Sequence, residues 1–241
     1  MARSVFRVGL LVCGHVDPRA QAVAGDYPAL FAALFAPHDV VLVPFAADEG
    51  DLPLSLSDCD GWITSPSRSS AYDDQPWVHG MVEVVRRLVE EERPFAGICF
   101  GHQLLAQALG GRVERAAVGW GVGPKQYEVV NQRPWMDPPA VDGHFRLVAS
   151  HEDQVTLLPP GAELLATSGY CPNAMMALGA RAIGLQPHPE FVAPLSAALL
   201  DLREEMIGAD RVTAARAVMG DPLDRELVAS WIINFLRGPA G

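Results

Sequence analysis

Short apolar runs alternate with helix-like segments through the first 111 residues, and this alternation restricts the chain to a few folds. The apolar runs predict strands over Val5–Val12, Val40–Phe45, Gly61–Thr64 and Phe95–Cys99. Segments with apolar residues at helical spacing predict helices over Pro28–Phe35, Trp77–Glu92 and Gln103–Leu109. Strands and helices in alternation are typical of a parallel sheet with helices on both faces. We therefore expect an α/β protein whose hydrophobic residues, 49% of the chain, supply a sizeable core.

Beyond Gly111 the apolar segments are shorter and are separated by turn residues. They predict further strands over Gln126–Val130, Phe145–Ala149, Leu164–Thr167, Ala174–Ala177 and Ile183–Gln186. The tail, Pro194–Leu236, has a mostly helical pattern, whereas Gly14–Asp26 is expected to be a loop. Neither a repeat nor a long linker divides the sequence, so we expect a single domain over residues 1–241.

The balance of charge narrows the range of partners. Lysine and arginine number 18 against 29 aspartate and glutamate residues, which gives a net charge of −11. Nucleic acids and anionic membranes bind clustered positive charge, so we expect neither as a partner and favour a small molecule or a protein. No run of about 18 apolar residues is present, so we expect no membrane-spanning segment.

The four cysteines, Cys13, Cys59, Cys99 and Cys171, lie far apart in the sequence, and no two form a Cys-x-x-Cys pair. This spacing favours neither a disulfide framework nor a zinc site. We expect a cytoplasmic protein whose thiols stay reduced and are available for chemistry.

One of these cysteines stands in a turn suited to a nucleophile. Residues 94–103 run from an apolar strand through Gly97-x-Cys99-x-Gly101 into a helix. Glycines two residues before and two after a nucleophile permit the tight turn that lifts its side chain clear of the backbone. The start of the helix brings backbone N–H groups near the sulfur, which favours the thiolate and stabilises a neighbouring oxyanion. The alternative is a buried structural cysteine at the end of a strand.

A second segment supplies a base and a group to orient it. His188 and Glu190 follow an apolar strand and are two residues apart, so in an extended chain their side chains point to the same face. Pro187 and Pro189 stiffen the segment and keep it out of a helix. Glu190 can then orient the ring of His188, which presents its other nitrogen to a thiol. The alternative is a proline-rich surface loop with an incidental histidine.

Together these motifs resemble the class I glutamine amidotransferase family. The resemblance rests on Gly97–Gln103, on Gln186–Glu190 and on Ala149–Val155, which is similar to a Ser-His-x-Asp-x-Val segment of the family. Gly25–Pro28 and Tyr72–Trp77 resemble its free-standing branch, which is similar to the amidotransferase part of GMP synthase and includes plant γ-glutamyl peptidases. The resemblance spans nearly the whole chain. It implies a flavodoxin-like fold of three layers, with a mostly parallel central sheet, helices on both faces and a helical C-terminal tail.

The same resemblance implies a Cys-His-Glu triad. Cys99 attacks the γ-carbonyl of a glutamyl substrate, His188 takes and returns a proton, and Glu190 holds the tautomer of His188. A γ-glutamyl thioester forms, ammonia or an amine leaves, and water releases glutamate. This chemistry uses side chains and backbone alone, so we expect no cofactor and no metal.

The tetrahedral oxyanion of such a reaction needs two hydrogen-bond donors. The N–H of Phe100, directly after the nucleophile, is expected to be one. The family usually has a Gly-Gly-Pro-like turn after its third strand, where this chain has the serine-rich segment 64–70. Aligning Pro66 with the family proline makes the N–H of Ser65 the second donor, and a one-residue shift gives the role to Ser67. The alternative is that these serines form a solvated turn.

Three polar residues are expected, by resemblance, to contact the glutamyl substrate. Gln103 follows Cys99 by four residues, and its family equivalent helps to hold the substrate. His151 and Asp153 are expected to shape the wall of the glutamyl pocket, with a polar strand end as the alternative. His102 is a competing base, but its ring would have to bend back toward the start of the helix, so we expect it to pack against the following loop instead.

Three functions are compatible with these residues. The first is hydrolysis of glutamine, with ammonia passed to a separate acceptor synthetase, because no Gly-x-x-x-x-Gly-Lys-Ser/Thr phosphate loop is present. The second is a self-contained hydrolase of γ-glutamyl peptides or amines, which has the same acyl chemistry and a different leaving-group pocket. The third is a non-catalytic binding or regulatory module, against which the intact set of Cys99, His188 and Glu190 argues. Loop shapes decide the leaving group, so the sequence leaves the first two functions open.

Overall fold

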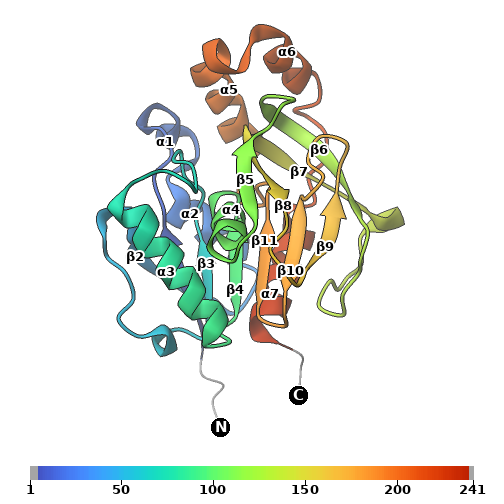
Figure 1. Ribbon diagram of the computed structural model, residues 1–241. Coiled ribbons are helices and arrows are strands. Elements are labelled where there is room, and N and C mark those ends of the chain that lie inside the picture. Colours follow the sequence, from blue (N-terminus) through green and yellow to red (C-terminus); the bar gives the residue numbers. More distant parts are fainter. Residues whose placement is uncertain (1–4, 239–241) are drawn as a thin grey trace.

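The computed structural model describes residues 5–238, and its centre is a nine-stranded sheet in the order β2-β1-β3-β4-β11-β10-β9-β6-β7 (Figure 1). The parallel strands are β1 (Phe6–Val12), β2 (Val40–Ala46), β3 (Gly61–Thr64), β4 (Phe95–Ile98) and β11 (Ala182–Leu185). The antiparallel strands are β6 (Gly121–Val129), β7 (His144–His151), β9 (Ala162–Thr167) and β10 (Met175–Leu178). A separate small antiparallel sheet consists of β5 (Arg112–Arg115) and β8 (Asp153–Leu157).

The order of the parallel strands, β2-β1-β3-β4-β11, is that of a flavodoxin-like sheet. From β1 the chain passes to one side to form β2 and returns on the other side to form β3. The segments that follow β1 and β3 therefore diverge beyond the carboxyl ends of these strands, where ligands bind in open α/β sheets. The flavodoxin-like class expected from the sequence is confirmed, and the antiparallel strands extend the parallel half on one side.

Helices cover both faces of the sheet (Figure 1). They are α1 (Pro18–Ala24), α2 (Tyr27–Phe35), α3 (Pro76–Glu90), α4 (Phe100–Ala108), α5 (Ala193–Ile207), α6 (Ala209–Ala217) and α7 (Arg225–Arg237). Successive residues of β1 face opposite sides, as a strand requires. Leu10 packs in a core with residues of α2 and α7, whereas Leu11 packs in a second core with residues of α3 and α4. The central strands are thus buried on both faces, and α5, α6 and α7 form the helical tail expected from the sequence.

Helix α3 shows how the sequence pattern produces these layers. Pro76 lies in its first turn, where a missing N–H breaks no intrahelical hydrogen bond. The residues of α3 that are buried recur every three or four positions along one face: Val78, Met81, Val84, Val85 and Leu88. This apolar stripe packs in the same core as Trp62 of β3 and Phe95 of β4.

The structure differs from the sequence expectations at four places. Residues 14–26, expected to be a loop, contain the short helix α1, which buries only Ala20 and so has no apolar periodicity to reveal it. Strand β5 was not expected, because Val113 is its only buried residue. The partner of β5, β8, was not expected either, and α4 begins at Phe100 rather than at Gln103.

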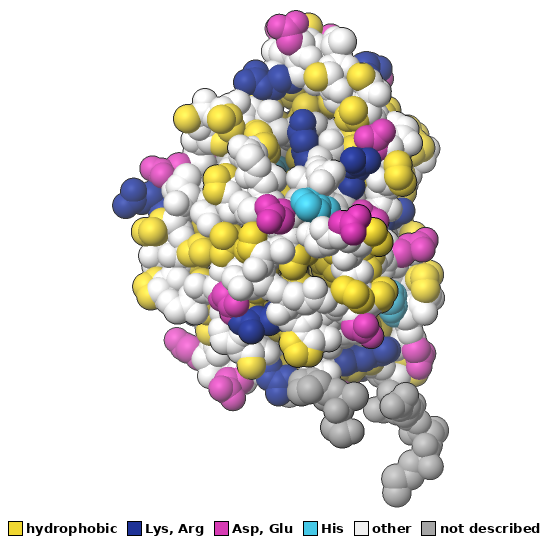
Figure 2. Space-filling model, turned by 90° about the vertical axis from the view of Figure 1, so that its right-hand side faces the viewer, with side chains coloured by type: hydrophobic (Ala, Val, Ile, Leu, Met, Phe, Trp, Pro, Cys, Tyr) yellow, Lys and Arg dark blue, Asp and Glu magenta, His cyan; other side chains and the backbone are white. Residues whose placement is uncertain are grey.

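The face viewed from the right-hand side of Figure 1 carries Lys and Arg side chains interspersed with Asp, Glu and hydrophobic side chains (Figure 2). Mixed charge of this kind is typical of a solvated surface. Within residues 5–238, no helix is long and apolar enough to cross a membrane.

Replacement of Trp231 by alanine is expected to lower the free energy of unfolding by about 3–5 kcal/mol, the usual cost of truncating a buried tryptophan. Trp231 is fully buried in α7, and its ring packs edge-on against Phe145 of β7 with the ring centroids 5.5 Å apart. Its Nε1 donates a hydrogen bond to the carbonyl oxygen of Pro138 at 2.7 Å. Urea unfolding followed by circular dichroism measures the change. Leu54→Ala is the control, since that side chain is 97% exposed and its loss should change stability by no more than about 0.5 kcal/mol. Equal stabilities of the two variants would contradict this packing.

Candidate active site

Cys99 occupies the turn between β4 and α4 in a strained backbone conformation. Its φ of 50° and ψ of −96° lie in a region that residues with a Cβ rarely adopt, and such strain costs about 1–3 kcal/mol. The turn is held on both sides by backbone hydrogen bonds. The N–H of Cys99 donates to the carbonyl of Leu185 at 2.7 Å, and the carbonyl of Cys99 accepts from the N–H of Gln103 at 3.1 Å. The neighbouring strand and helix therefore fix the direction of the thiol.

The two glycines that flank this turn are required by close approach. A Cβ on Gly97 would come within 2.8 Å of the backbone nitrogen of His102, and a Cβ on Gly101 would overlap the hydroxyl of Thr64. That hydroxyl also accepts a hydrogen bond from the N–H of Ile98 at 3.1 Å. The start of α4 is thus pressed against β3 and β4, which is possible only without side chains at these two positions.

His188 and Glu190 form a buried hydrogen-bonded pair. Nδ1 of His188 lies 2.8 Å from Oε1 of Glu190, and the two side chains are 2% and 0% exposed. The N–H of His188 donates to the carbonyl of Val148 in β7 at 2.9 Å, and its ring stacks on that of Phe191 with the centroids 4.1 Å apart. Arg225 of α7 donates to the carbonyl oxygen of Glu190 from the other side, at 3.3 Å. With Nδ1 engaged, Nε2 of His188 is the nitrogen left without a partner among the described residues.

Charge around His188 favours its protonated form. Burial by itself lowers the pKa of His188, but the negative charges of Glu190 and Cys99 raise it, and the net effect places this pKa well above the usual range for histidine. The charges of these neighbours thus outweigh the effect of burial on His188.

A chain of amides reaches the sulfur from the opposite wall. Nε2 of Gln103 donates to the carbonyl of Asp153 at 2.9 Å and to Oε1 of Gln186 at 3.2 Å. Nε2 of Gln186 in turn lies 3.5 Å from Sγ of Cys99. Gln186 was quoted in the sequence analysis only as part of a motif. Its contact with the sulfur follows from its place directly after β11, the strand that pairs with β4.

His151 and Asp153 lie side by side at the ends of β7 and β8. Nδ1 of His151 is 3.1 Å from the carbonyl oxygen of Asp153, and burial together with the charge of His188 lowers the pKa of His151 to about 3, so its ring is neutral. The carboxylate of Asp153 accepts hydrogen bonds from the hydroxyls of Ser70 at 2.5 Å and Tyr72 at 3.1 Å. These bonds tie the segment after β3 to the small sheet.

These groups open into a cleft beyond the carboxyl ends of β1, β3 and β4, with a volume of about 320 Å³. Cys99, Gln103, His151 and Asp153 all line it. The rest of the lining comes from the segments after β1 and β3, from the end of β5 and the segment that follows it, from the end of β7 and the turn to β8, and from α5. The cleft thus lies at the crevice that the strand order produces.

Comparison with known proteins identifies the family. Residues 31–200 match the family described as "Glutamine amidotransferase class-I". The chain belongs to this family. Gamma-glutamyl peptidase 3 of Arabidopsis thaliana is 28% identical over 224 residues, covering 89% of this chain and 90% of that protein. GMP synthase (glutamine-hydrolyzing) of Phenylobacterium zucineum is 39% identical over 117 residues, or 48% of this chain and 22% of that protein. A solved glutamine amidotransferase from Thermotoga maritima shares the fold, with a TM-score of 0.74, 20% identity and coverage of 97% of both chains.

The expectation that Ser65 donates to an oxyanion in this amidotransferase chain is wrong. The N–H of Ser65 already donates to the carbonyl of Leu11 at 2.9 Å, which continues the pairing of β3 with β1. Its hydroxyl is also engaged, since it donates to the carbonyl of Pro66 at 3.0 Å. Ser67 lines the cleft, and no acceptor for its N–H is found in the part of the chain that the structure describes. The N–H of Phe100 lies in the first turn of α4, where helices have no internal acceptor.

His102 packs in the interior against β11, whereas the sequence predicted packing against the following loop. It is fully buried, and it lies so close to Gly184 of β11 that a Cβ there would come within 2.5 Å of its Nδ1. Burial lowers the pKa of His102 to about 4, so the ring is neutral at neutral pH. A neutral ring held against a strand fits a packing role in this family member.

Glu190→Gln is expected to lower the pKa of His188, because the charge of Glu190 raises it and an amide carries none. In the unaltered protein the ring should stay protonated from acid through neutral pH. In the variant it should lose its proton at a lower pH. NMR titration of ¹³C-labelled histidine measures both values. Glu152→Gln is the matched control: this cleft carboxylate is paired with Arg115 at 3.2 Å and does not contribute to the pKa of His188. An equal pKa of His188 in the unaltered protein and the Glu190→Gln variant would show that Glu190 does not raise this pKa.

Proposed function

We propose that this chain hydrolyses γ-glutamyl amide bonds through a thioester on Cys99. The observation that carries the proposal is a single arrangement. A strained cysteine turn opens into a cleft, and the buried pair of His188 and Glu190 lies close enough for the charge of Cys99 to raise the pKa of His188. Membership of the class-I glutamine amidotransferase family supports the same chemistry.

The proposed reaction begins with the Cys99 thiolate and the His188 imidazolium. The sulfur attacks the γ-carbonyl carbon, and the carbonyl oxygen becomes an oxyanion that accepts hydrogen bonds from the N–H groups of Phe100 and Ser67. As the C–N bond breaks, Nε2 of His188 gives its proton to the leaving nitrogen. Nε2 then takes a proton from water, whose oxygen attacks the thioester, and glutamate is released as the thiolate re-forms. Glu190 holds Nδ1 of His188 throughout and stabilises the imidazolium.

The glutamyl part of the substrate is proposed to lie against the wall formed by Gln103, His151 and Asp153. Asp153 is oriented by Ser70 and Tyr72, and Gln103 by the carbonyl of Asp153, so this wall is pre-formed. Gln186 is proposed to hold the sulfur in position between attacks, because its amide donor is directed at Sγ.

The size of the cleft favours a γ-glutamyl peptide or amine over glutamine as substrate. A volume of about 320 Å³ lies in the range of sites that hold drug-sized ligands, about 300–1,000 Å³, and glutamine alone is smaller than such ligands. The peptidase relative also aligns over 89% of this chain, against 48% for the GMP synthase relative. We therefore place self-contained hydrolysis of γ-glutamyl peptides first.

Hydrolysis of glutamine is the second candidate, and the 39% identity with a glutamine-hydrolyzing GMP synthase favours it. In this case a separate synthetase would accept the ammonia. We place either activity in the reducing cytoplasm, because a thiol nucleophile must stay unoxidised to attack.

Glutamate release from purified protein separates the two candidates. We expect γ-glutamyl dipeptides to be turned over much faster than glutamine. Cys99→Ala and His188→Ala should each abolish this turnover to a similar extent, because residues that act as one unit lose activity together. Glu190→Gln should lower turnover by less than either of these variants. His102→Ala should retain turnover, because it leaves the proposed triad intact. Retention of most activity by His188→Ala, with its loss in His102→Ala, would mean that the base is assigned to the wrong histidine.

A glutamine analogue with a diazoketone or chloroketone at the γ-carbon is expected to label Cys99 and no other cysteine. Burial raises the pKa of Cys13, Cys59 and Cys171, so these three remain protonated and unreactive. Mass spectrometry of peptides locates the label. An excess of γ-glutamyl dipeptide should protect Cys99 from labelling. Iodoacetamide is the control reagent, because it reports a reactive thiol without recognition of the glutamyl group. Labelling of all four cysteines, or labelling that no γ-glutamyl compound reduces, would favour the non-catalytic alternative.

A further inference from the structure

Arg203 of α5 brings a positive charge into the cleft without an acidic partner. Its guanidinium lines the cleft, and Nη1 donates to the hydroxyl of Ser150 at 3.2 Å. Within residues 5–238, no carboxylate lies within 4 Å of this guanidinium. Burial lowers the pKa of Arg203, which means that the charge is partly removed from water at this position. A partly desolvated cation without a carboxylate in contact can bind an anion.

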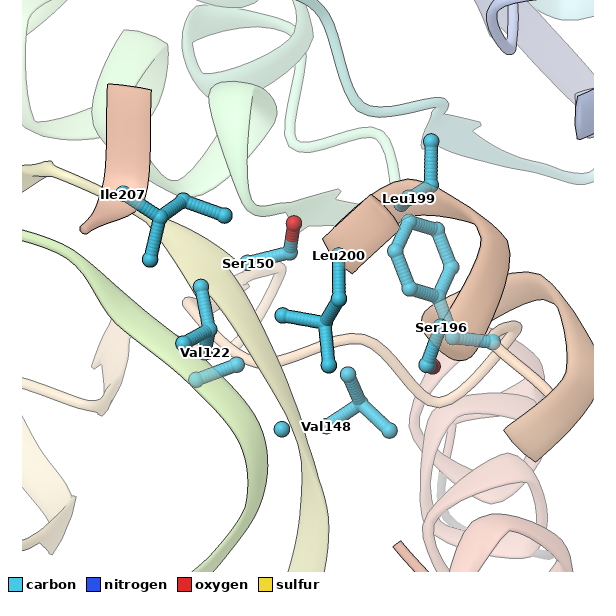
Figure 3. A pocket seen from close by; sticks show the side chains of 10 residues that line it. Val122, Val148, Ser150, Ser196, Leu199, Leu200 and Ile207 are labelled. Atoms are coloured by element: carbon cyan, nitrogen blue, oxygen red, sulfur yellow. The ribbon is translucent and has the colours of Figure 1, made fainter. Parts of the chain in front are cut away.

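The helix that carries Arg203 is firmly seated. Its apolar side chains, among them Leu199 and Leu200, pack over Val122 of β6 and Val148 of β7 (Figure 3). The space left between them is only about 10 Å³, roughly enough for one water molecule. Ser150, labelled in Figure 3, borders this space and also holds Arg203. Arg203 is therefore presented from a rigid element.

The wall around Arg203 has a positive balance, although the whole chain carries a net charge of −11. The wall consists of Asp17, Arg19, Arg68 and Arg203, and Asp17 is its one carboxylate. Asp17 is paired with Arg19, whose Nε and Nη2 donate to it at 3.0 and 2.9 Å. Arg68 is at 3.8 Å from the same carboxylate. Arg19 and Arg68 thus share this one carboxylate, whereas Arg203 contacts none and is the least exposed to water of the three guanidinium groups.

This wall is contributed by elements other than those of the proposed glutamyl wall. Arg19, Arg68 and Arg203 come from α1, from the segment after β3 and from α5. The glutamyl wall comes from α4 and from the ends of β7 and β8. Cys99 lines the same cleft as these arginines.

We propose that Arg203, with Arg68 beside it, binds a carboxylate on the leaving group and so selects γ-glutamyl compounds in which an amino acid is the group released. This inference rests on the proposed hydrolysis of γ-glutamyl amides. A planar guanidinium matches a carboxylate through two parallel hydrogen bonds, and an amino acid linked through its nitrogen carries its carboxylate one carbon beyond that nitrogen. The apolar side chains of Trp120, Leu202 and Met206 also line the cleft and can exclude water from such a pair.

A matched pair of substrates tests the assignment: γ-glutamylglycine, whose leaving group ends in a carboxylate, and γ-glutamylglycinamide, whose leaving group ends in an amide. Turnover of either by the unaltered protein tests the proposed hydrolysis independently of Arg203. Arg203→Gln is expected to raise KM for γ-glutamylglycine by about tenfold or more, the effect of losing a charged hydrogen bond. For γ-glutamylglycinamide KM should stay within about twofold. Arg203→Lys should raise KM for γ-glutamylglycine by less than Arg203→Gln does. Arg216→Gln, at an exposed position on α6, should leave KM for both substrates unchanged.

Two outcomes would overturn the assignment. An equal loss with both substrates would show that Arg203 binds the α-carboxylate of the glutamyl group, and no loss with either would show that it binds no carboxylate. If the unaltered protein hydrolyses neither compound, the proposed function fails. Calorimetric binding of the two compounds to Cys99→Ala, with and without Arg203→Gln, then tests the carboxylate site by itself. Weaker binding of γ-glutamylglycine alone in the double variant would support the site, and unchanged binding of both would exclude it.

Discussion

The close approach of Gly101 to Thr64 is the contact on which the candidate active site depends. It brings the first turn of α4 against β3, and the threonine hydroxyl at the same time accepts the N–H of Ile98 at the end of β4. With strand and helix held this closely, the backbone at Cys99 has no room for an ordinary conformation and adopts a positive φ. The cost of about 1–3 kcal/mol is small beside the stability of the packed sheet around it. The same turn directs the thiol toward the cleft and places the N–H of Phe100 next to it.

The turn at Cys99 and the His188–Glu190 pair could be predicted from the sequence because each is a local pattern. The Gly97-x-Cys99-x-Gly101 spacing has one tight geometry available to it, and two residues at i and i+2 of an extended segment share a face. The parallel half of the sheet was readable for a similar reason, since buried strands and amphipathic helices differ in period. These features need no knowledge of distant parts of the chain.

The features that the sequence did not predict correctly depend on contacts between distant segments. The N–H of Ser65 is occupied because β3 continues its pairing with β1 by one more residue, and no pattern within segment 64–70 reveals that register. Helix α1 is too short to show a periodicity, and β5 has a single buried residue to mark it. Arg203 is one charged residue among several on α5, and it becomes distinctive only when that helix docks on β7.

The position of β11 in the sheet has a consequence for how the protein acquires activity during synthesis. Within residues 5–238, β11 is the last strand, yet it lies in the middle of the sheet, between β4 and β10, and pairs residues 95–98 with residues 182–185. The ribosome therefore releases the turn at Cys99 long before the strand that completes its surroundings. His188 and Glu190 follow β11 directly, so the base of the proposed reaction arrives only when this strand inserts. An emerging chain thus carries the Cys99 thiol without that proposed base, and the candidate site is complete only when β11 fills the space between β4 and β10.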